Sequence, residues 1–187
     1  MRHHSTGRPP SPATRIAKWH SNAPHDPQVI ALRVPGESGR HNLQVLEGGV
    51  AVDDRGTVSF VNNFDFRGVK RFYKIENFSK DVIRAFHGHV HEAKYVYVVS
   101  GSFILVAIPM TDTVNPSRDV KPSRLVLSDR KPAIVFIPPG YVNGFRALED
   151  NSQILFFSTS TLEEAKGDDF RFPPDYWGAQ IWSVENR

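Results

Sequence analysis

The chain has 187 residues, of which 40% are hydrophobic and 23% charged, and it contains no cysteine. This length suits one domain with a core of its own, and the lack of cysteine excludes disulfides and thiolate metal sites and favours a reducing, cytoplasmic setting. The net charge of +3 is modest, the basic residues form no dense stripe of the kind that nucleic-acid binding needs, and no stretch has the apolar length of a membrane helix. We therefore expect neither a nucleic-acid nor a membrane partner.

Residues 1–27 are rich in Pro, Ser, His and Arg and lack apolar periodicity, so we predict a flexible arm and one domain over 28–187. Short apolar runs separated by turn residues then predict a β-hairpin over 49–61, with its turn at 53–56. Further strands are predicted at 69–75, 82–90, 94–100, 102–109, 123–128, 132–137, 143–148 and 152–159. A helical turn is expected at 161–166. Many short strands without a long helix indicate a sandwich, jelly roll or barrel.

Three histidines, His87, His89 and His91, recur every second residue on one predicted strand. Alternate residues of a strand share a face, and the apolar neighbours Phe86 and Val90 indicate that this strand is partly buried. Imidazoles that line the interior of a barrel are suited to ligate a metal or to transfer protons. Solvated histidines on a surface strand are the alternative.

The spacing resembles that of the cupins, whose pattern is His-x-His, then Glu and Gly, and later Pro-x-Gly followed by His. In this chain Lys94 stands at the Glu position and Asn143 at the second His position. An ammonium repels a divalent cation and Asn is a weak ligand for transition metals, so we expect no metal and no other cofactor. A histidine base beside a fixed cation suits proton abstraction next to a carbonyl group, with the cation stabilising the enolate.

Metal-free cupins of this kind are the nucleotide-sugar epimerases and isomerases. The Arg-Gly-Leu-His, Asp-x-Arg-Gly and Pro-x-Gly-Phe-x-His-Gly-Phe motifs of the dTDP-4-dehydrorhamnose 3,5-epimerases resemble Arg84–His87, Asp53–Gly56 and Pro138–Phe145. The Lys-Arg-Val-Tyr and Arg-Gly-x-His-Ala-His motifs of the sugar 3,4-ketoisomerases resemble Lys70–Tyr73 and Arg84–His89. The resemblance implies an all-β cupin (jelly-roll) barrel with isomerase activity and, as is common in the family, a homodimer in which an N-terminal strand completes the partner's sheet.

The resemblance also implies catalytic roles. His87 would be the general base, and Lys94 would face the developing enolate. A late aspartate orients the histidine in the epimerases, and Asp175 is the best candidate for that role here. We expect Asp168 and Asp169 to lie in a solvated loop instead.

A second group of residues would bind the nucleotide-diphosphate sugar. Arg84 and Arg55 would hold sugar or diphosphate oxygens, for which the guanidinium fork is suited; exposed salt bridges are the alternative for both. The other residues expected to contact substrate are His89, Arg71, Tyr73, Asn143 and Tyr141.

One departure concerns the second proton donor that epimerisation requires. The epimerases carry a tyrosine where this chain has Phe156 or Phe157, and phenylalanine transfers no proton. Tyr73, Tyr141, Tyr176 and His89 are the alternative donors. Three functions follow in order: an epimerase of a nucleotide-linked 4-keto-6-deoxy sugar, a 3,4-ketoisomerase of the same fold, or a catalytically silent cupin that binds a sugar or nucleotide.

Overall fold

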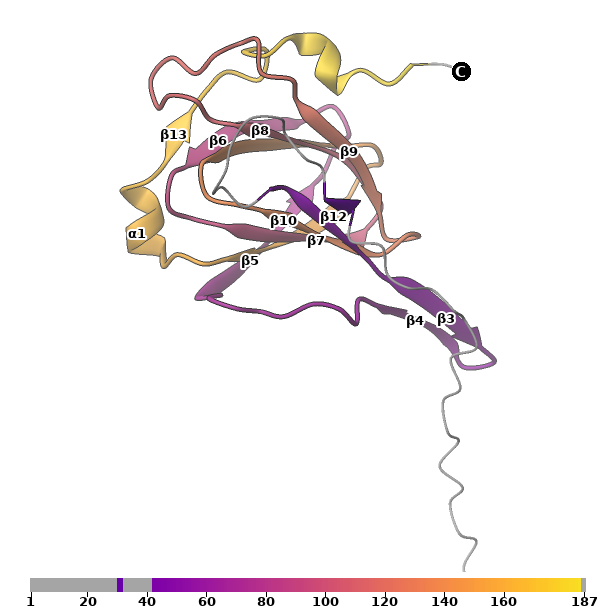
Figure 1. Cartoon of the computed structure of the whole chain (residues 1–187). Coiled ribbons are helices and arrows are strands. Elements are labelled where there is room, and N and C mark those ends of the chain that lie inside the picture. Colours follow the sequence, from indigo (N-terminus) through magenta and orange to yellow (C-terminus); the bar gives the residue numbers. More distant parts are fainter. Residues whose placement is uncertain (1–29, 32–41, 186–187) are drawn as a thin grey trace, which may run out of the picture.

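The structure, a computed structural model, describes residues 30–31 and 42–185, so the predicted arm over 1–27 lies outside the described residues. Two antiparallel sheets face each other and form a barrel, as Figure 1 shows. The six-stranded sheet has the order β1 (Ile30–Ala31), β2 (Gln44–Glu47), β10 (Ala133–Ile137), β7 (Lys94–Ser100), β12 (Ser152–Ser158) and β5 (Arg71–Asn77). The five-stranded sheet has the order β13 (Phe170–Arg171), β6 (Ile83–His89), β11 (Tyr141–Ala147), β8 (Ser102–Pro109) and β9 (Ser123–Ser128).

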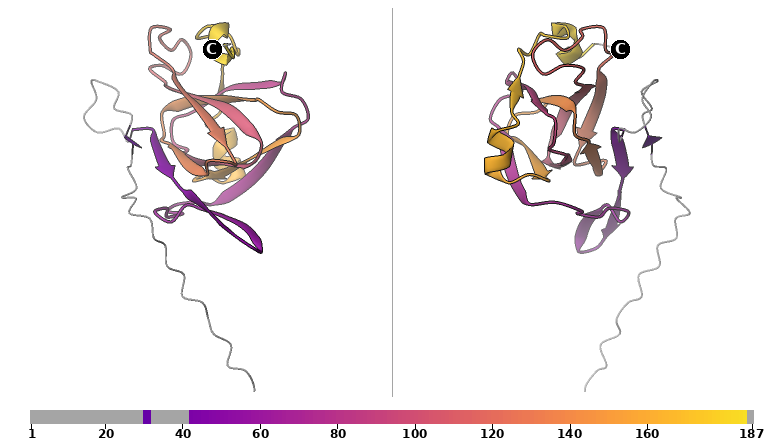
Figure 2. Two further views of the ribbon diagram at one scale, coloured as in Figure 1. Left: turned by 90° about the vertical axis from the view of Figure 1, so that its right-hand side faces the viewer. Right: turned by 60° about the vertical axis from the view of Figure 1, so that its left-hand side comes forward.

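Three further elements lie outside the two sheets. Strands β3 (Gly49–Asp53) and β4 (Gly56–Phe60) form a separate hairpin, which stands away from the barrel in Figures 1 and 2. Helix α1 (Leu162–Lys166) follows β12, and the 3-10 helix η1 (Ala179–Trp182) lies near the C-terminus. None of the described helices has the length and apolar character needed to cross a membrane.

The core between the sheets follows from the two-residue period of the strands. On β12, Ile154 and Phe156 are buried while Leu155 and Phe157 are partly exposed on the outer face. The inward residues join those of β7, β8 and β11 in one apolar cluster, which includes Val96, Leu105 and Phe145. This arrangement confirms the predicted all-β cupin barrel, and the expected strands and helical turn are present with ends shifted by a few residues.

Gly88 separates the two histidines of β6 for a steric reason. A Cβ atom there would lie 2.7 Å from a methyl group of Val142 and 2.9 Å from the sulfur of Met110. At Gly88, the face of β6 opposite the histidines therefore packs too tightly for any side chain.

Candidate active site

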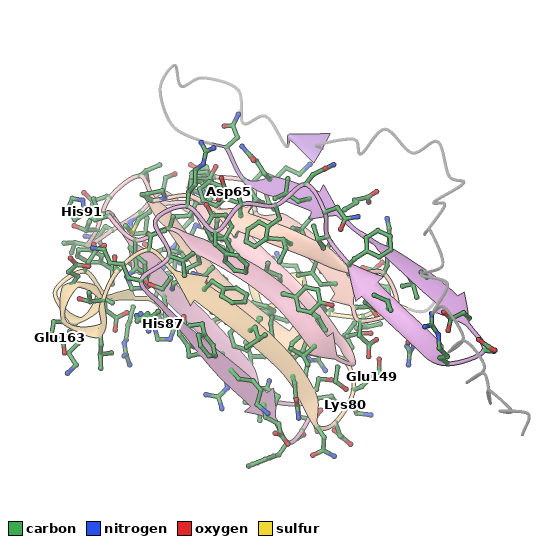
Figure 3. All side chains as sticks on the ribbon, turned by 90° about the horizontal axis from the view of Figure 1, so that it is seen from below. Asp65, Lys80, His87, His91, Glu149 and Glu163 are labelled. Atoms are coloured by element: carbon green, nitrogen blue, oxygen red, sulfur yellow. The ribbon has the colours of Figure 1, made fainter. Side chains whose placement is uncertain are left out.

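A cavity of about 520 Å³ lies between the two sheets at one end of the barrel. In Figure 3 this end carries His87 and, on α1, Glu163, whereas Lys80 and Glu149 mark the other end. The polar and charged residues that line the cavity are Arg71, Tyr73, Arg84, His87, His89, Glu92, Lys94, Asn143, Lys166, Asp169 and Arg171. Apolar side chains, among them Ile75, Phe145 and Phe156, form the rest of the wall.

His87 is held by a carboxylate that arrives from the neighbouring strand. Strand β13 pairs with β6 so that Arg171 lies opposite His87, and this places Asp169 Oδ1 3.2 Å from His87 Nδ1. Arg171 Nε donates to the other oxygen of Asp169 at 2.9 Å. Because a carboxylate only accepts hydrogen bonds, the Nδ1 atom carries the hydrogen and the lone pair of Nε2 is free to take a proton.

The ionisation of this pair suits a general base. Burial lowers the pKa of His87 and outweighs the opposing effect of Asp169, so the imidazole is neutral at neutral pH. Burial would raise the pKa of Asp169, but hydrogen bonds from Arg171 and His87 outweigh it and lower the pKa. The pair is therefore a neutral imidazole held by an ionised aspartate.

A second carboxylate, Glu92, lies at the centre of a buried cluster. It is 2% exposed, with Oε2 at 3.0 Å from His89 Nε2 and at 3.6 Å from Lys94 Nζ. Oε1 accepts hydrogen bonds from Arg71 Nη2 at 3.0 Å and from the Ser158 hydroxyl. Burial opposes ionisation, but the contacts with His89, Lys94 and Ser158 prevail and lower the pKa of Glu92 to about 2.

This cluster holds a cation, Lys94, and a histidine, His89, against the carboxylate of Glu92. Lys94 is 5% exposed, and burial lowers its pKa although the nearby charge of Glu92 opposes that effect. We assign the ammonium form from the 3.6 Å contact between Nζ and the Glu92 carboxylate. His89 is 7% exposed, and its Nδ1 atom is buried without a hydrogen-bond partner among the described residues. The side chain of His89 thus has one nitrogen against Glu92 and one buried nitrogen without a partner among the described residues.

The remaining predicted contacts surround these two pairs. Asn143 is buried on β11 opposite His87 and donates from Nδ2 to the His87 carbonyl at 3.2 Å. Arg84 is exposed at the edge of the cavity, where its Nε donates to Asn77 at 2.9 Å. Tyr73 projects inward from β5 and stacks on Phe156, with ring centroids 5.3 Å apart. The cavity thus joins a neutral base, a fixed ammonium and arginines in one space.

The family model of dTDP-4-dehydrorhamnose 3,5-epimerase matches residues 41–173, which is most of the chain. The chain belongs to the dTDP-4-dehydrorhamnose 3,5-epimerase family. Its structural neighbours include epimerases and ketoisomerases, and the chain shares their fold. A comparison with curated proteins finds no match.

Solved structures share the fold at low sequence identity. The rmlC epimerase of Mycobacterium tuberculosis has a TM-score of 0.63 at 20% identity, over 84% of this chain and 78% of that one. A 3'-monoepimerase of Streptomyces bikiniensis, in complex with dTDP-quinovose, has a TM-score of 0.60 at 16% identity over 74% and 73%. A 3,4-ketoisomerase of Helicobacter canadensis has a TM-score of 0.54 at 18% identity over 74% and 96%.

Three expected site residues of this family member lie outside the cavity. Asp175 is exposed in the loop before η1, and Asp169 takes its expected place at His87. Arg55 lies on the β3–β4 hairpin, where its exposed side chain pairs with Asp53. Tyr141 is 5% exposed and packs into the core between the sheets, so its side chain is absent from the cavity lining. The prediction for Asp175 was wrong because it relied on order in the sequence rather than on the pairing of β13.

Sequence reasoning also missed four residues that shape the site. Asp169 was expected in a solvated loop. Arg171, Glu92 and Lys166 on α1 were not among the predicted site residues. Asp168, also assigned to the solvated loop, is 7% exposed. The sequence signal that could have indicated Asp169 and Arg171 is the pair of adjacent aspartates, Asp168 and Asp169, directly before the short segment Phe170–Arg171.

Most ionisable groups of the cavity already have partners. The described residues hold no group of three or more His, Cys, Asp or Glu side chains arranged to bind a metal ion. His87 and His89 have separate carboxylate partners, Asp169 and Glu92. What the arrangement can do is remove a proton through His87 Nε2 and stabilise a neighbouring anionic oxygen with Lys94.

Proposed function

We propose that the protein is an epimerase of a dTDP-linked 4-keto-6-deoxy sugar and acts without a metal, by proton abstraction next to the keto group. Family membership supports the class of substrate. The observation that carries the proposal is the His87–Asp169 contact of 3.2 Å at the wall of a cavity that also contains the ammonium of Lys94. These are the two groups that enolisation requires.

In the proposed reaction, His87 Nε2 takes the proton from the carbon beside the ketone. The electron pair moves to the carbonyl oxygen, and Lys94 stabilises the resulting enolate. Arg84 and Lys166 lie at the edge of the same cavity, and neither side chain forms an ion pair with any described residue. Both are therefore placed to bind the diphosphate of the substrate.

The test is solvent exchange at the carbons beside the ketone. We expect the full chain, incubated in D2O with dTDP-4-keto-6-deoxyglucose, to incorporate deuterium at C3 or C5, detected by NMR. His87→Ala should lower the exchange rate by about 10²–10⁴-fold, the usual contribution of a general base. His91→Ala is the matched control, because His91 is exposed outside the cavity. Exchange that survives His87→Ala unchanged would contradict the mechanism, and tight dTDP binding without exchange would favour a silent binding protein.

One observation favours 3,4-ketoisomerisation as a second candidate. His89 lies two residues from His87 on the same face of β6 and lines the same cavity, and two imidazoles on one face suit proton movement between neighbouring carbons. Solved 3,4-ketoisomerases share the fold. Product analysis separates the two reactions, since a ketoisomerase moves the keto group to C3 whereas an epimerase leaves it at C4.

We also propose that the protein is a cytoplasmic homodimer. The outer face of the six-stranded sheet is aromatic, as the rings spread across it in Figure 3 indicate. Phe72 on this face is 67% exposed and Phe66 is 52% exposed. An apolar sheet face of this kind suits burial against a second copy. In such a dimer, Arg55 would bind substrate only if the β3–β4 hairpin reached the cavity of the partner.

A further inference from the structure

The tyrosine that the family uses as its second proton carrier is absent from β12, where Phe156 lines the cavity. The chain has five tyrosines, all within the described residues. Tyr95 and Tyr97 lie on the outer face of β7, where Tyr95 packs against Phe136. Tyr141 is buried in the core, and the Tyr176 hydroxyl donates to the Pro116 carbonyl at 3.0 Å. Of the five, Tyr73 alone lines the cavity.

Tyr73 is the direct cross-strand neighbour of the missing tyrosine. In the register of β5 and β12 it lies opposite Phe156, and the two rings are nearly parallel, with an interplanar angle of 5°. A hydroxyl on Tyr73 instead of on residue 156 is therefore displaced by one strand spacing, about 5 Å. The side chain of this tyrosine faces the same cavity as Phe156.

The hydroxyl of Tyr73 is free to meet a ligand. Among the described residues this hydroxyl has no hydrogen-bond partner. The buried polar atoms that lack a partner do not include its oxygen. It therefore opens to the space of the cavity. Burial, followed by the charge of Glu92, raises the pKa of Tyr73, so the phenol holds its proton at neutral pH and can donate it.

Tyr73 and His87 approach this space from different walls. Tyr73 belongs to β5 of the six-stranded sheet and His87 to β6 of the five-stranded sheet. A sugar ring between the sheets would present one face to each residue. Inversion at carbon requires this arrangement, because the proton that leaves and the proton that arrives are on opposite faces.

We propose that Tyr73 is the catalytic acid that protonates the enolate on the face opposite His87. His87 Nε2 removes the proton from the carbon beside the ketone, and the C–H electron pair forms the enolate. The enolate carbon then takes the proton of the Tyr73 hydroxyl, the ketone re-forms with inverted configuration, and solvent returns a proton to the phenolate and removes one from the imidazolium. This inference rests on the proposed function and identifies the residue that makes the reaction an epimerisation.

The experiment compares two rates in D2O for each variant: deuterium incorporation next to the ketone and formation of the inverted sugar. In Tyr73→Phe we expect incorporation through His87 to persist with retained configuration, while the ratio of inversion to incorporation falls by about 10²-fold or more. A merely structural role would lower both rates together. The double variant Tyr73→Phe/Phe156→Tyr should regain inversion, because it returns a hydroxyl to the same wall.

Tyr176→Phe is the matched control, since it removes a hydroxyl that is bonded outside the cavity, and it should leave the ratio unchanged. An unchanged ratio in Tyr73→Phe would overturn this inference alone. Absence of deuterium incorporation in the wild-type protein would overturn the proposed function together with this inference. The two failures are therefore distinguishable.

Discussion

Asp168 and Asp169 are neighbours in the chain, yet their carboxylates hold two different parts of the site. Asp168 accepts hydrogen bonds from the backbone N–H groups of Val90, His91 and Glu92 at 2.8, 2.8 and 3.2 Å. Asp169 contacts the His87 side chain. One aspartate thus secures the turn that carries Glu92, and the other orients the base.

Asp169→Asn should lower kcat by about 10²–10⁴-fold, the range expected when a histidine base loses the carboxylate that fixes its tautomer. The pH profile should change as well. The base acts when neutral, so activity falls as pH drops through the pKa of His87. Asp169 raises that pKa, and its removal should move the acidic limb of the kcat/KM profile to lower pH. Glu163→Gln, at an exposed acid on α1, is the control; an unmoved limb in Asp169→Asn would contradict the assignment.

Asp168→Ala should act on stability. It leaves three backbone N–H groups without their buried acceptor, and the loss of bonds to a charged group should lower the free energy of unfolding by about 2–4 kcal/mol. Urea unfolding measures this difference. Asp54→Ala, in the exposed turn of the β3–β4 hairpin, should change it by less than about 0.5 kcal/mol. A similar small effect at Asp168 would show that the turn is held by other contacts.

The strands could be predicted because their signal is local. On β12 and β7 the alternation of inward and outward residues is present in any short window of sequence, and the hairpin around Asp53–Gly56 follows from its turn residues. Strand β13 has two residues and lies in a polar segment, so no periodicity marks it. It exists through pairing with β6, a contact between segments about eighty residues apart in the chain.

The residues of the candidate site also differ in whether a local sequence pattern marks them. His87, His89 and Lys94 could be predicted because they lie in one strand pattern and its continuation. Their partners, Asp169 and Glu92, could not be predicted in the same way: one depends on the pairing of β13, and the other lies in the turn between β6 and β7, where no spacing rule applies. Arg55 illustrates the converse, since a motif match gives no information on where a hairpin is placed.

Glu92→Gln should destabilise the protein at neutral pH. The substitution leaves the buried Lys94 and the partly buried Arg71 without their shared negative charge, a change that costs about 3–5 kcal/mol when a buried ion pair is broken. The pKa of Glu92 is lowered to about 2, so its stabilising contribution is complete above the ordinary value of 4.5 and is lost as pH falls from there towards 2. Urea unfolding of both proteins at pH 7, 4 and 3 should therefore show a difference that shrinks with acidification. If the difference in unfolding free energy between the two proteins did not depend on pH, the ionised Glu92 carboxylate would not be the stabilising group.

Phe72→Asp should convert the proposed dimer to a monomer. Phe72 is 67% exposed on the outer face of the six-stranded sheet, and a carboxylate placed there would have to be buried without a partner when two such faces meet. Light scattering coupled to size exclusion measures the mass. Val126→Asp is the matched control, because Val126 is 61% exposed on β9 of the other sheet and should leave the mass unchanged. A dimer that survives Phe72→Asp but not Val126→Asp would place the interface on the five-stranded sheet instead, and a monomeric wild-type protein would contradict the dimer itself.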